Sequence, residues 1–183
     1  MKTDQSLTPD LRQALLQVAR RTLEQYLIHH VLPVIECPFP ALMEHRGAFV
    51  TLHQEEVLRG CIGTFEATDP LWYTIQRMAI SAATADPRFP SVKVAELESL
   101  HFEISVLSPL WEASPEEIQI GTHGIYLSRG FQRGVLLPQV AVEYGWDRET
   151  FLEHTCIKAG LPHGAWKAPE TKVEIFSAEV FGE

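Results

Sequence analysis

The segment LRGCIG, which begins at residue 58, combines an arginine and a cysteine with two glycines. Side chains alternate along a strand, so Arg59 and Cys61 share one face, roughly 7 Å apart along the chain. A cation beside a thiol favours the thiolate, which is the nucleophilic form. Glycines inside a strand allow a ligand or another backbone to come close. We therefore predict that Cys61 is a catalytic thiol and that Arg59, Gly60, Ile62 and Gly63 bind a ligand.

The same segment has a simpler interpretation. Cysteine is a common small core residue, and a glycine in a strand can mark a bulge. In that case LRGCIG is a packing motif, formed where a strand passes closely beneath a helix. Residue types alone leave both interpretations open.

Two other segments carry groups that could take part in chemistry. In DPRFP, prolines stiffen the backbone around Asp86 and Arg88. Arg88 could bind a ligand and Asp86 could transfer a proton, or the two could form an ion pair that holds its own corner. In GTHG, His123 is a weaker candidate for a general acid or base, because turn histidines are usually solvated.

The sequence predicts no metal site and identifies no cofactor. His154 and Cys156 are two residues apart on a predicted helix, so they do not face each other. The zinc patterns HExxH and paired CxxC are absent, as are GxGxxG, the Walker lysine motif and GxSxG.

Composition narrows the class of protein. The 183 residues include 15 Lys and Arg against 24 Asp and Glu, a net charge of −9, which argues against a nucleic-acid partner. The three cysteines form no CxxC pair, which indicates a reducing compartment. No apolar run reaches the roughly 18 residues that a membrane span needs, and the polar start MKTDQSLTPD does not resemble a signal peptide. We expect a cytoplasmic protein that binds no membrane.

Helices and strands are expected to alternate irregularly. The first helix follows a cap at Thr8, the second begins after a cap at Asp69 and stops before Pro87, and the last runs from a cap at Asp147 to Gly160. Alternating apolar residues predict strands, two of which form a hairpin around a loop of residues 129–134. These strands are 48–53, 57–64, 101–107, 125–127, 135–137 and 173–181. This order favours an α+β fold of layered helices and antiparallel hairpins over a βαβ winding.

Several segments occur together in the order typical of one family: LRGCIGTF, ADPRFP, ELESLHFEISVLSPL, GTHGIYL, GVLLPQVAVEYGWDRETFLEHTCIKAGLP and EVF. From about Ala48 to Phe181 the chain resembles the AMMECR family, whose prokaryotic members are called AmmeMemoRadiSam system protein A. The LRGCIG stretch matches the family signature completely. The resemblance implies one domain over residues 1–183, with two subdomains, a discontinuous larger lobe and a cleft between the lobes.

The resemblance leaves the activity open, because the family has no established reaction. Prokaryotic relatives occur with a Memo-like protein and a radical-SAM enzyme, which are therefore the implied partners. We expect a protein that binds a small ligand or a protein partner at the LRGCIG surface, with thiol chemistry at Cys61. The alternative is a non-enzymatic module that docks a Memo-like or other protein, with LRGCIG partly a packing motif.

Overall fold

The computed structural model describes residues 6–183, and the chain divides into two compact units. Unit 1 comprises the chain up to Leu107 together with Glu179–Glu183, and unit 2 comprises Ser108–Ala178. None of the helices in the described chain has the length and apolar character needed to cross a membrane.

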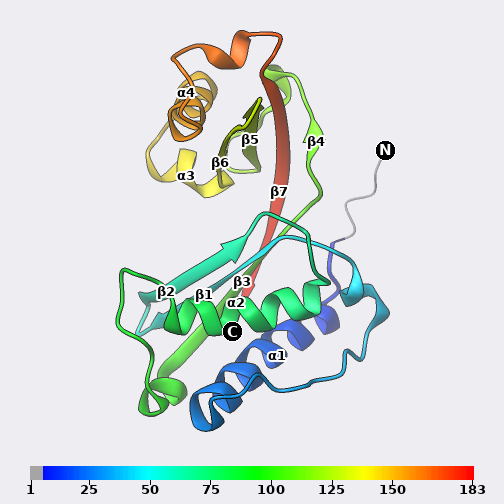
Figure 1. Cartoon of the computed structure of the whole chain (residues 1–183), viewed down its shortest axis with the longest axis vertical. Helices are drawn as coiled ribbons and strands as arrows, with labels where there is room; N and C mark the ends of the chain where they lie inside the picture. Colours follow the sequence, from blue (N-terminus) through cyan, green and yellow to red (C-terminus); the bar gives the residue numbers. More distant parts are fainter. Residues whose placement is uncertain (1–5) are drawn as a thin grey trace. The chain divides into compact units, whose positions relative to one another are not determined.

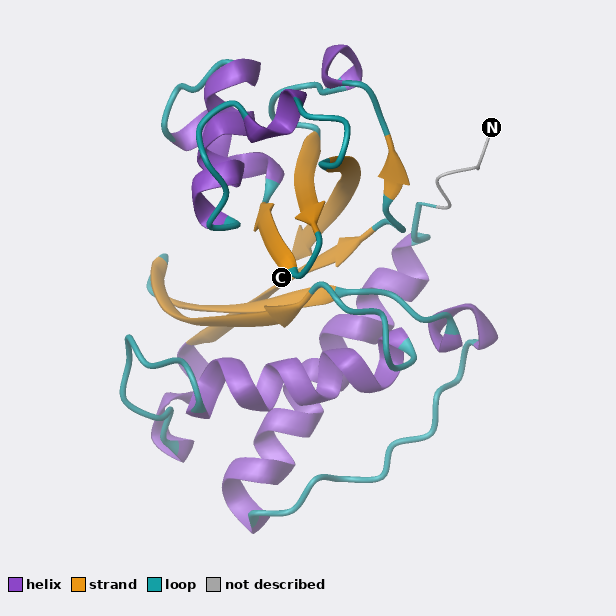
Figure 2. Ribbon diagram, turned by 45° about the horizontal axis from the view of Figure 1, so that its top comes forward, coloured by secondary structure: helices purple, strands orange, loops and turns teal. Residues whose placement is uncertain are grey.

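Unit 1 is an antiparallel sheet with two long helices on one face (Figures 1 and 2). The strands are β1 (Ala48–Gln54), β2 (Val57–Thr64) and β3 (Leu100–Leu107), in the order β2-β1-β3. The final residues of β7 (Lys172–Gly182) follow next to β3, so β2 lies at the sheet edge. The helices are α1 (Pro9–His29) and α2 (Leu71–Thr84), with short 3-10 turns η1 (Pro40–Met43) and η2 (Val94–Ser99).

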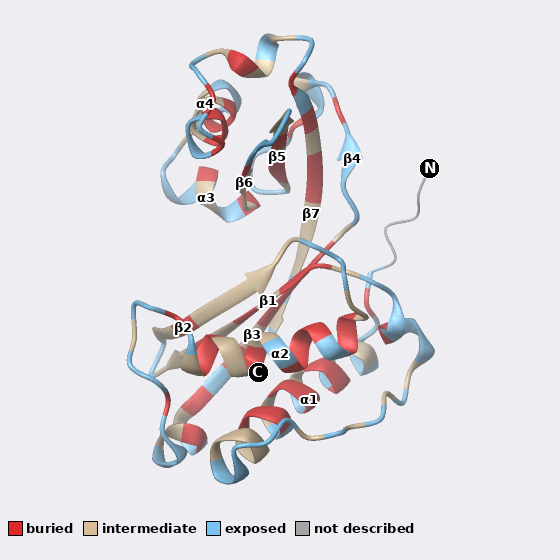
Figure 3. Cartoon of the chain, viewed as in Figure 1, coloured by how far each residue is buried: buried red, intermediate tan, exposed pale blue. Residues whose placement is uncertain are grey.

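The core of unit 1 forms where the apolar stripes of the helices meet one face of the sheet. Phe102, Ile104 and Val106 of β3 are buried, as the alternation of this strand predicts. In α1, Leu15, Val18 and Thr22 follow one another at helical spacing and are buried on one face of the helix. Figure 3 shows buried segments on α1, on α2 and on the strands of the sheet. The helical and strand periods in the sequence therefore identify the buried faces correctly.

The two helix starts in unit 1 differ. The Thr8 side chain caps α1, accepting a hydrogen bond from the Leu11 N–H at 3.4 Å. The predicted cap at Asp69 is wrong, because α2 begins after Pro70 without a side-chain cap. The Asp69 carboxylate instead pairs with Arg77 of α2 at 2.7 Å, which keeps its negative charge near the helix N-terminus.

Unit 2 contains a smaller antiparallel sheet and two helices. Its strands are β4 (Trp111–Glu112), β5 (His123–Arg129), β6 (Gln132–Leu136) and the first part of β7, which pairs with both β4 and β5. The helices are α3 (Pro138–Glu143) and α4 (Arg148–Lys158), with short turns η3 (Pro115–Glu117) and η4 (Ala165–Lys167). The predicted cap of α4 is confirmed, since Asp147 accepts a hydrogen bond from the Thr150 N–H at 2.8 Å.

The β5–β6 hairpin is tighter than its sequence predicts. Arg129 pairs with Gln132, so the loop contains only Gly130 and Phe131. Gly130 has a φ of 57°, the left-handed conformation that a glycine adopts readily at the first position of a two-residue turn. The prediction of a loop over residues 129–134 is wrong, because the strands continue to the turn. The α+β class is confirmed, whereas the cleft between lobes stays a prediction.

Candidate functional site

The two glycines of LRGCIG are packed against other parts of unit 1. A Cβ atom on Gly60 would lie 2.1 Å from the carbonyl oxygen of Ala82 in α2. A Cβ atom on Gly63 would lie 2.2 Å from the ring of Phe49 on the neighbouring strand. Glycine is therefore needed at both positions so that β2 can pass close to α2 and beneath the Phe49 ring. The close approach predicted from the sequence is an approach of the protein's own atoms.

A β-bulge breaks the alternation of β2 at Arg59. The register shifts between Leu52, which lies opposite Gly60, and His53, which lies opposite Leu58. Arg59 therefore has no residue opposite it on β1, and the simple assignment of Arg59 and Cys61 to one face does not account for its position.

The Arg59 side chain is an internal anchor. It donates to the two carboxylate oxygens of Glu96 at 2.8 and 3.3 Å, and to the Pro90 carbonyl at 2.8 Å. Only 13% of the Arg59 side chain is exposed. The hydrogen bonds from Arg59 hold the pKa of Glu96 below its usual range. Arg59 thus ties β2 to η2 and to the DPRFP corner, and its bonds do not go to the Cys61 thiol.

The DPRFP corner holds the backbone of Cys61 on its outer side. The Cys61 N–H donates to Asp86 Oδ2 at 2.9 Å, and its carbonyl accepts a bond from the Arg88 guanidinium at 3.5 Å. Edge strands carry backbone groups that a further strand would otherwise pair. Asp86 and Arg88 supply those partners at Cys61, so the corner takes the place of a neighbouring strand.

Asp86 is a buried anchor. Its side chain is 2% exposed and accepts bonds from the Arg88 side chain at 3.0 and 2.7 Å and from the Arg88 N–H at 3.1 Å. Together with the Cys61 N–H, four donors surround this carboxylate. Hydrogen bonds from the Arg88 side chain, which outweigh the effect of burial, hold the Asp86 pKa far below its usual range. This geometry favours the corner-holding ion pair, while proton transfer by Asp86 stays a prediction.

The Cys61 thiol lies on the sheet face opposite the helices. Cys61 pairs with Thr51, whose neighbours Val50 and Leu52 point into the buried core. The Thr51 hydroxyl donates to Cys61 Sγ at 3.2 Å. Glu103 of β3 lies opposite Thr51 on its other side, so a thiol, a hydroxyl and a carboxylate occupy adjacent strands. Cys61 is partly exposed there.

The other predicted site residues lie elsewhere. Ile62 packs partly against the core of unit 1. His123 belongs to unit 2, where its Nδ1 accepts a hydrogen bond from the Gln119 N–H at 3.2 Å and its ring meets the edge of Trp111. Within unit 1, Cys61, Asp86 and Arg88 come together. Within residues 6–183, no three His, Cys, Asp or Glu side chains are grouped in a way that could hold a metal.

Sequence reasoning missed Thr51 and Glu96. Thr51 could not be found from the hairpin alone, because regular pairing outward from the turn at Glu55–Glu56 places Val50 opposite Cys61, and the bulge at Arg59 shifts the partner to Thr51. The pairing of Arg59 with Glu96 spans 37 residues, and no local pattern indicates it.

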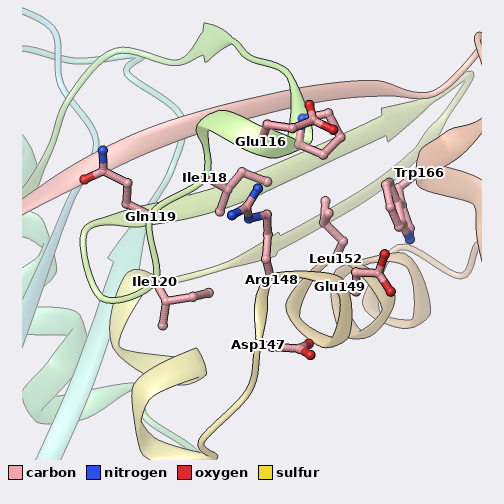
Figure 4. A pocket seen from close by; sticks show the side chains of 10 residues that line it. Glu116, Ile118, Gln119, Ile120, Asp147, Arg148, Glu149, Leu152 and Trp166 are labelled. Atoms are coloured by element: carbon pink, nitrogen blue, oxygen red, sulfur yellow. The ribbon is translucent and has the colours of Figure 1, made fainter.

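Unit 2 contains a separate open pocket of about 610 Å³, lined by the β4–β5 connection, the first turns of α4, and Trp166 of η4 (Figure 4). Ile118 and Leu152 form its apolar floor, and the Arg148 side chain extends across it.

Comparison with known proteins identifies the family. A family model described as AMMECR1 matches residues 16–181. The chain belongs to the AMMECR1 family. A protein of Methanothermobacter thermautotrophicus is 44% identical over 185 residues, covering 97% of this chain and 96% of that protein. A protein of Pyrococcus furiosus is 46% identical over 182 residues, covering 92% of this chain and 86% of that protein.

A solved member of the AMMECR1 family has the same fold. The crystal structure of an uncharacterised protein from Pyrococcus horikoshii matches with a TM-score of 0.79 and 44% sequence identity. The match covers 92% of this chain and 89% of that chain. The family resemblance read from LRGCIG and the segments that follow it is therefore confirmed.

Proposed function

We propose that the protein binds a small ligand or a segment of a protein partner at the sheet surface around Cys61, and that the thiol makes the decisive contact. The observation that carries this proposal is the contrast between the Cys61 backbone and its side chain. The backbone is held by Asp86 and Arg88, whereas the thiol stays partly exposed and, within residues 6–183, accepts a hydrogen bond only from the neutral hydroxyl of Thr51. A fixed, accessible sulfur is suited to contact or attack a bound group.

The surrounding residues divide into supporting and contacting roles. Arg59, Gly60 and Gly63 support the strand, because their interactions are with Glu96, Ala82 and Phe49. Arg88 is paired with Asp86, yet 55% of its side chain is exposed. Its guanidinium therefore supplies positive charge beside the thiol. An anionic group of a ligand could contact the exposed guanidinium while another part of the ligand reaches the thiol.

Alkylation of the native protein tests the accessibility of the thiol. Iodoacetamide should modify Cys61 in the folded protein, and peptide mass spectrometry identifies the modified cysteine. Cys156 is a built-in control, because it is buried and burial raises the pKa of its thiol. A Cys37→Ser variant should keep the fast reaction and a Cys61→Ser variant should lose it. A Cys61 that reacts only after denaturation would contradict the proposal.

The family resemblance supplies candidate partners, a Memo-like protein and a radical-SAM enzyme. Replacing Cys61 by Glu places a bulky charge on the proposed surface, whereas Val57→Glu places it at a position of the same strand that is 68% exposed. Recovery of the Memo-like protein in a pull-down should fall for Cys61→Glu alone. Equal recovery with both variants would argue against docking at this surface. Three unpaired cysteines favour the reducing cytoplasm as the place where these proteins meet.

A further inference from the structure

The tip of the β5–β6 hairpin presents an aromatic side chain to solvent. Phe131 is fully exposed, at 102% of its reference area, and Gly130 beside it has open space around its Cα. Arg129 and Arg133 flank the tip. Arg129 is paired with Glu170, whereas Arg133 donates to the carbonyls of Gly130 and Gln132 and has no carboxylate partner among the described residues. The hairpin tip therefore has an apolar end, Phe131, with the positive charge of Arg133 beside it.

The pocket of unit 2 has the opposite character. Ile118 and Leu152 are buried in its floor, and Ile120 and Trp166 stand beside them (Figure 4). Glu116 and Glu149 line the same pocket. Arg148 is its only cation among the lining residues, so carboxylates outnumber guanidinium groups there. The apolar pocket with its carboxylates therefore complements the apolar tip, which has Arg133 beside it.

The protrusion and the pocket lie at opposite ends of α4. Gln132, next to the tip, donates to the carbonyl of Gly160, just beyond the C-terminal end of the helix. The pocket is lined by Arg148 and Glu149, the first two residues of the helix. An eleven-residue helix is about 16 Å long, so the tip of one molecule does not reach its own pocket.

We propose that Phe131 of one copy of the chain occupies the unit 2 pocket of a second copy. The phenyl ring would lie on the Ile118–Leu152 floor with the Arg148 guanidinium over its face, a cation–π arrangement. Arg133 would approach Glu116 and Glu149. The two surfaces are different, so the contact is heterologous, and an open assembly keeps a free tip at one end and a free pocket at the other. Such a contact builds rings or open chains rather than a closed dimer.

Sedimentation velocity on the full chain tests this contact. Because the interface is small, association should be weak, so the weight-average sedimentation coefficient is measured up to about 1 mM protein. It should rise with concentration for the wild type and stay at the monomer value for Phe131→Ser. The matched control is Val34→Ser, which removes an equally exposed apolar side chain (99%) from unit 1 and should associate like the wild type.

A mixing experiment separates this contact from other kinds of self-association. Ile120→Glu should block the pocket, just as Phe131→Ser removes the tip, and circular dichroism checks that both variants are folded. Each variant alone should remain monomeric, and their 1:1 mixture should form a dimer that grows no further. A wild type that stays monomeric over the whole range, a Phe131→Ser protein that associates normally, or a mixture that stays monomeric would each overturn the proposal.

Discussion

Replacing Gly60 by alanine tests the closest approach in unit 1. The new Cβ would lie 2.1 Å from the Ala82 carbonyl oxygen and 3.0 Å from its carbon. An ordinary contact between carbon and oxygen is about 3.3 Å, so β2 and α2 must separate locally by roughly 1 Å. Both atoms belong to the backbone of packed elements, so the clash cannot be relieved by a rotamer change. Overpacking of this kind costs about 3 kcal/mol of unfolding free energy.

Gly182 provides the matched control, because it lies in the same unit and also faces a carbonyl oxygen. Its Cβ would be 3.2 Å from the oxygen of Phe102, a contact that small shifts relieve. Urea unfolding should therefore show a loss of about 3 kcal/mol for Gly60→Ala and under about 1 kcal/mol for Gly182→Ala. The first loss corresponds to a fall in Tm of roughly 6–12 °C. Hydrogen exchange measured on peptides from β2 and α2 should show that the loss of protection in Gly60→Ala lies within unit 1.

Equal stability of Gly60→Ala and Gly182→Ala would refute the reasoning. It would mean that β2 does not pass Ala82 at this distance and that Gly60 is not a packing residue. The glycine would then again be a candidate for ligand approach.

Three further predictions concern charges and turns. Arg59→Gln should lower the unfolding free energy by about 2–3 kcal/mol, because it leaves the Glu96 carboxylate partly buried without its partner, and a double-mutant cycle with Glu96→Gln should show strong coupling. The Asp86 pKa is depressed in the folded state, so its stabilisation is present above the unfolded value of about 3.9 and is lost as pH falls below it. Asp86→Asn should therefore flatten the acid limb of stability measured by urea unfolding, and an unchanged limb would count against the ion pair. Glu56 has a φ of 64°, so Glu56→Gly should raise the melting midpoint by relieving a strain of about 1 kcal/mol, and a lower midpoint would contradict this.

The sequence predicts those features of the fold that depend on neighbouring residues. The caps at Thr8 and Asp147 need only a side chain that reaches an N–H three residues on, and both are present. The buried face of β3 follows from its alternation at Phe102 and Ile104. The predicted cap at Asp69 is wrong because the Asp69 carboxylate pairs with Arg77 instead of capping the helix.

The sequence predicts which residues belong to the candidate site, but it does not predict how they are arranged. Cys61, Asp86 and Arg88 are all sequence candidates, and they meet because the corner docks on the edge of β2. The role expected of Arg59 depended on strict alternation, which the bulge removes. Its actual partner Glu96 is set by tertiary packing over a long stretch of chain. Local patterns thus indicate which residues are available for chemistry, and long-range contacts decide which of them are used for support.

The two ends of unit 2 lie next to each other, which makes this unit useful for protein engineering. The chain enters this unit at Ser108 and leaves it after Ala178, and Ser108 and Ser177 exchange two hydrogen bonds of 2.9 Å. A module whose entry and exit are adjacent can be removed as one cassette, transplanted into a surface loop of another scaffold, or circularly permuted by joining its ends with a short linker. Residues 108–178 are therefore a natural unit of transfer, and the hairpin tip and acidic pocket would travel with it.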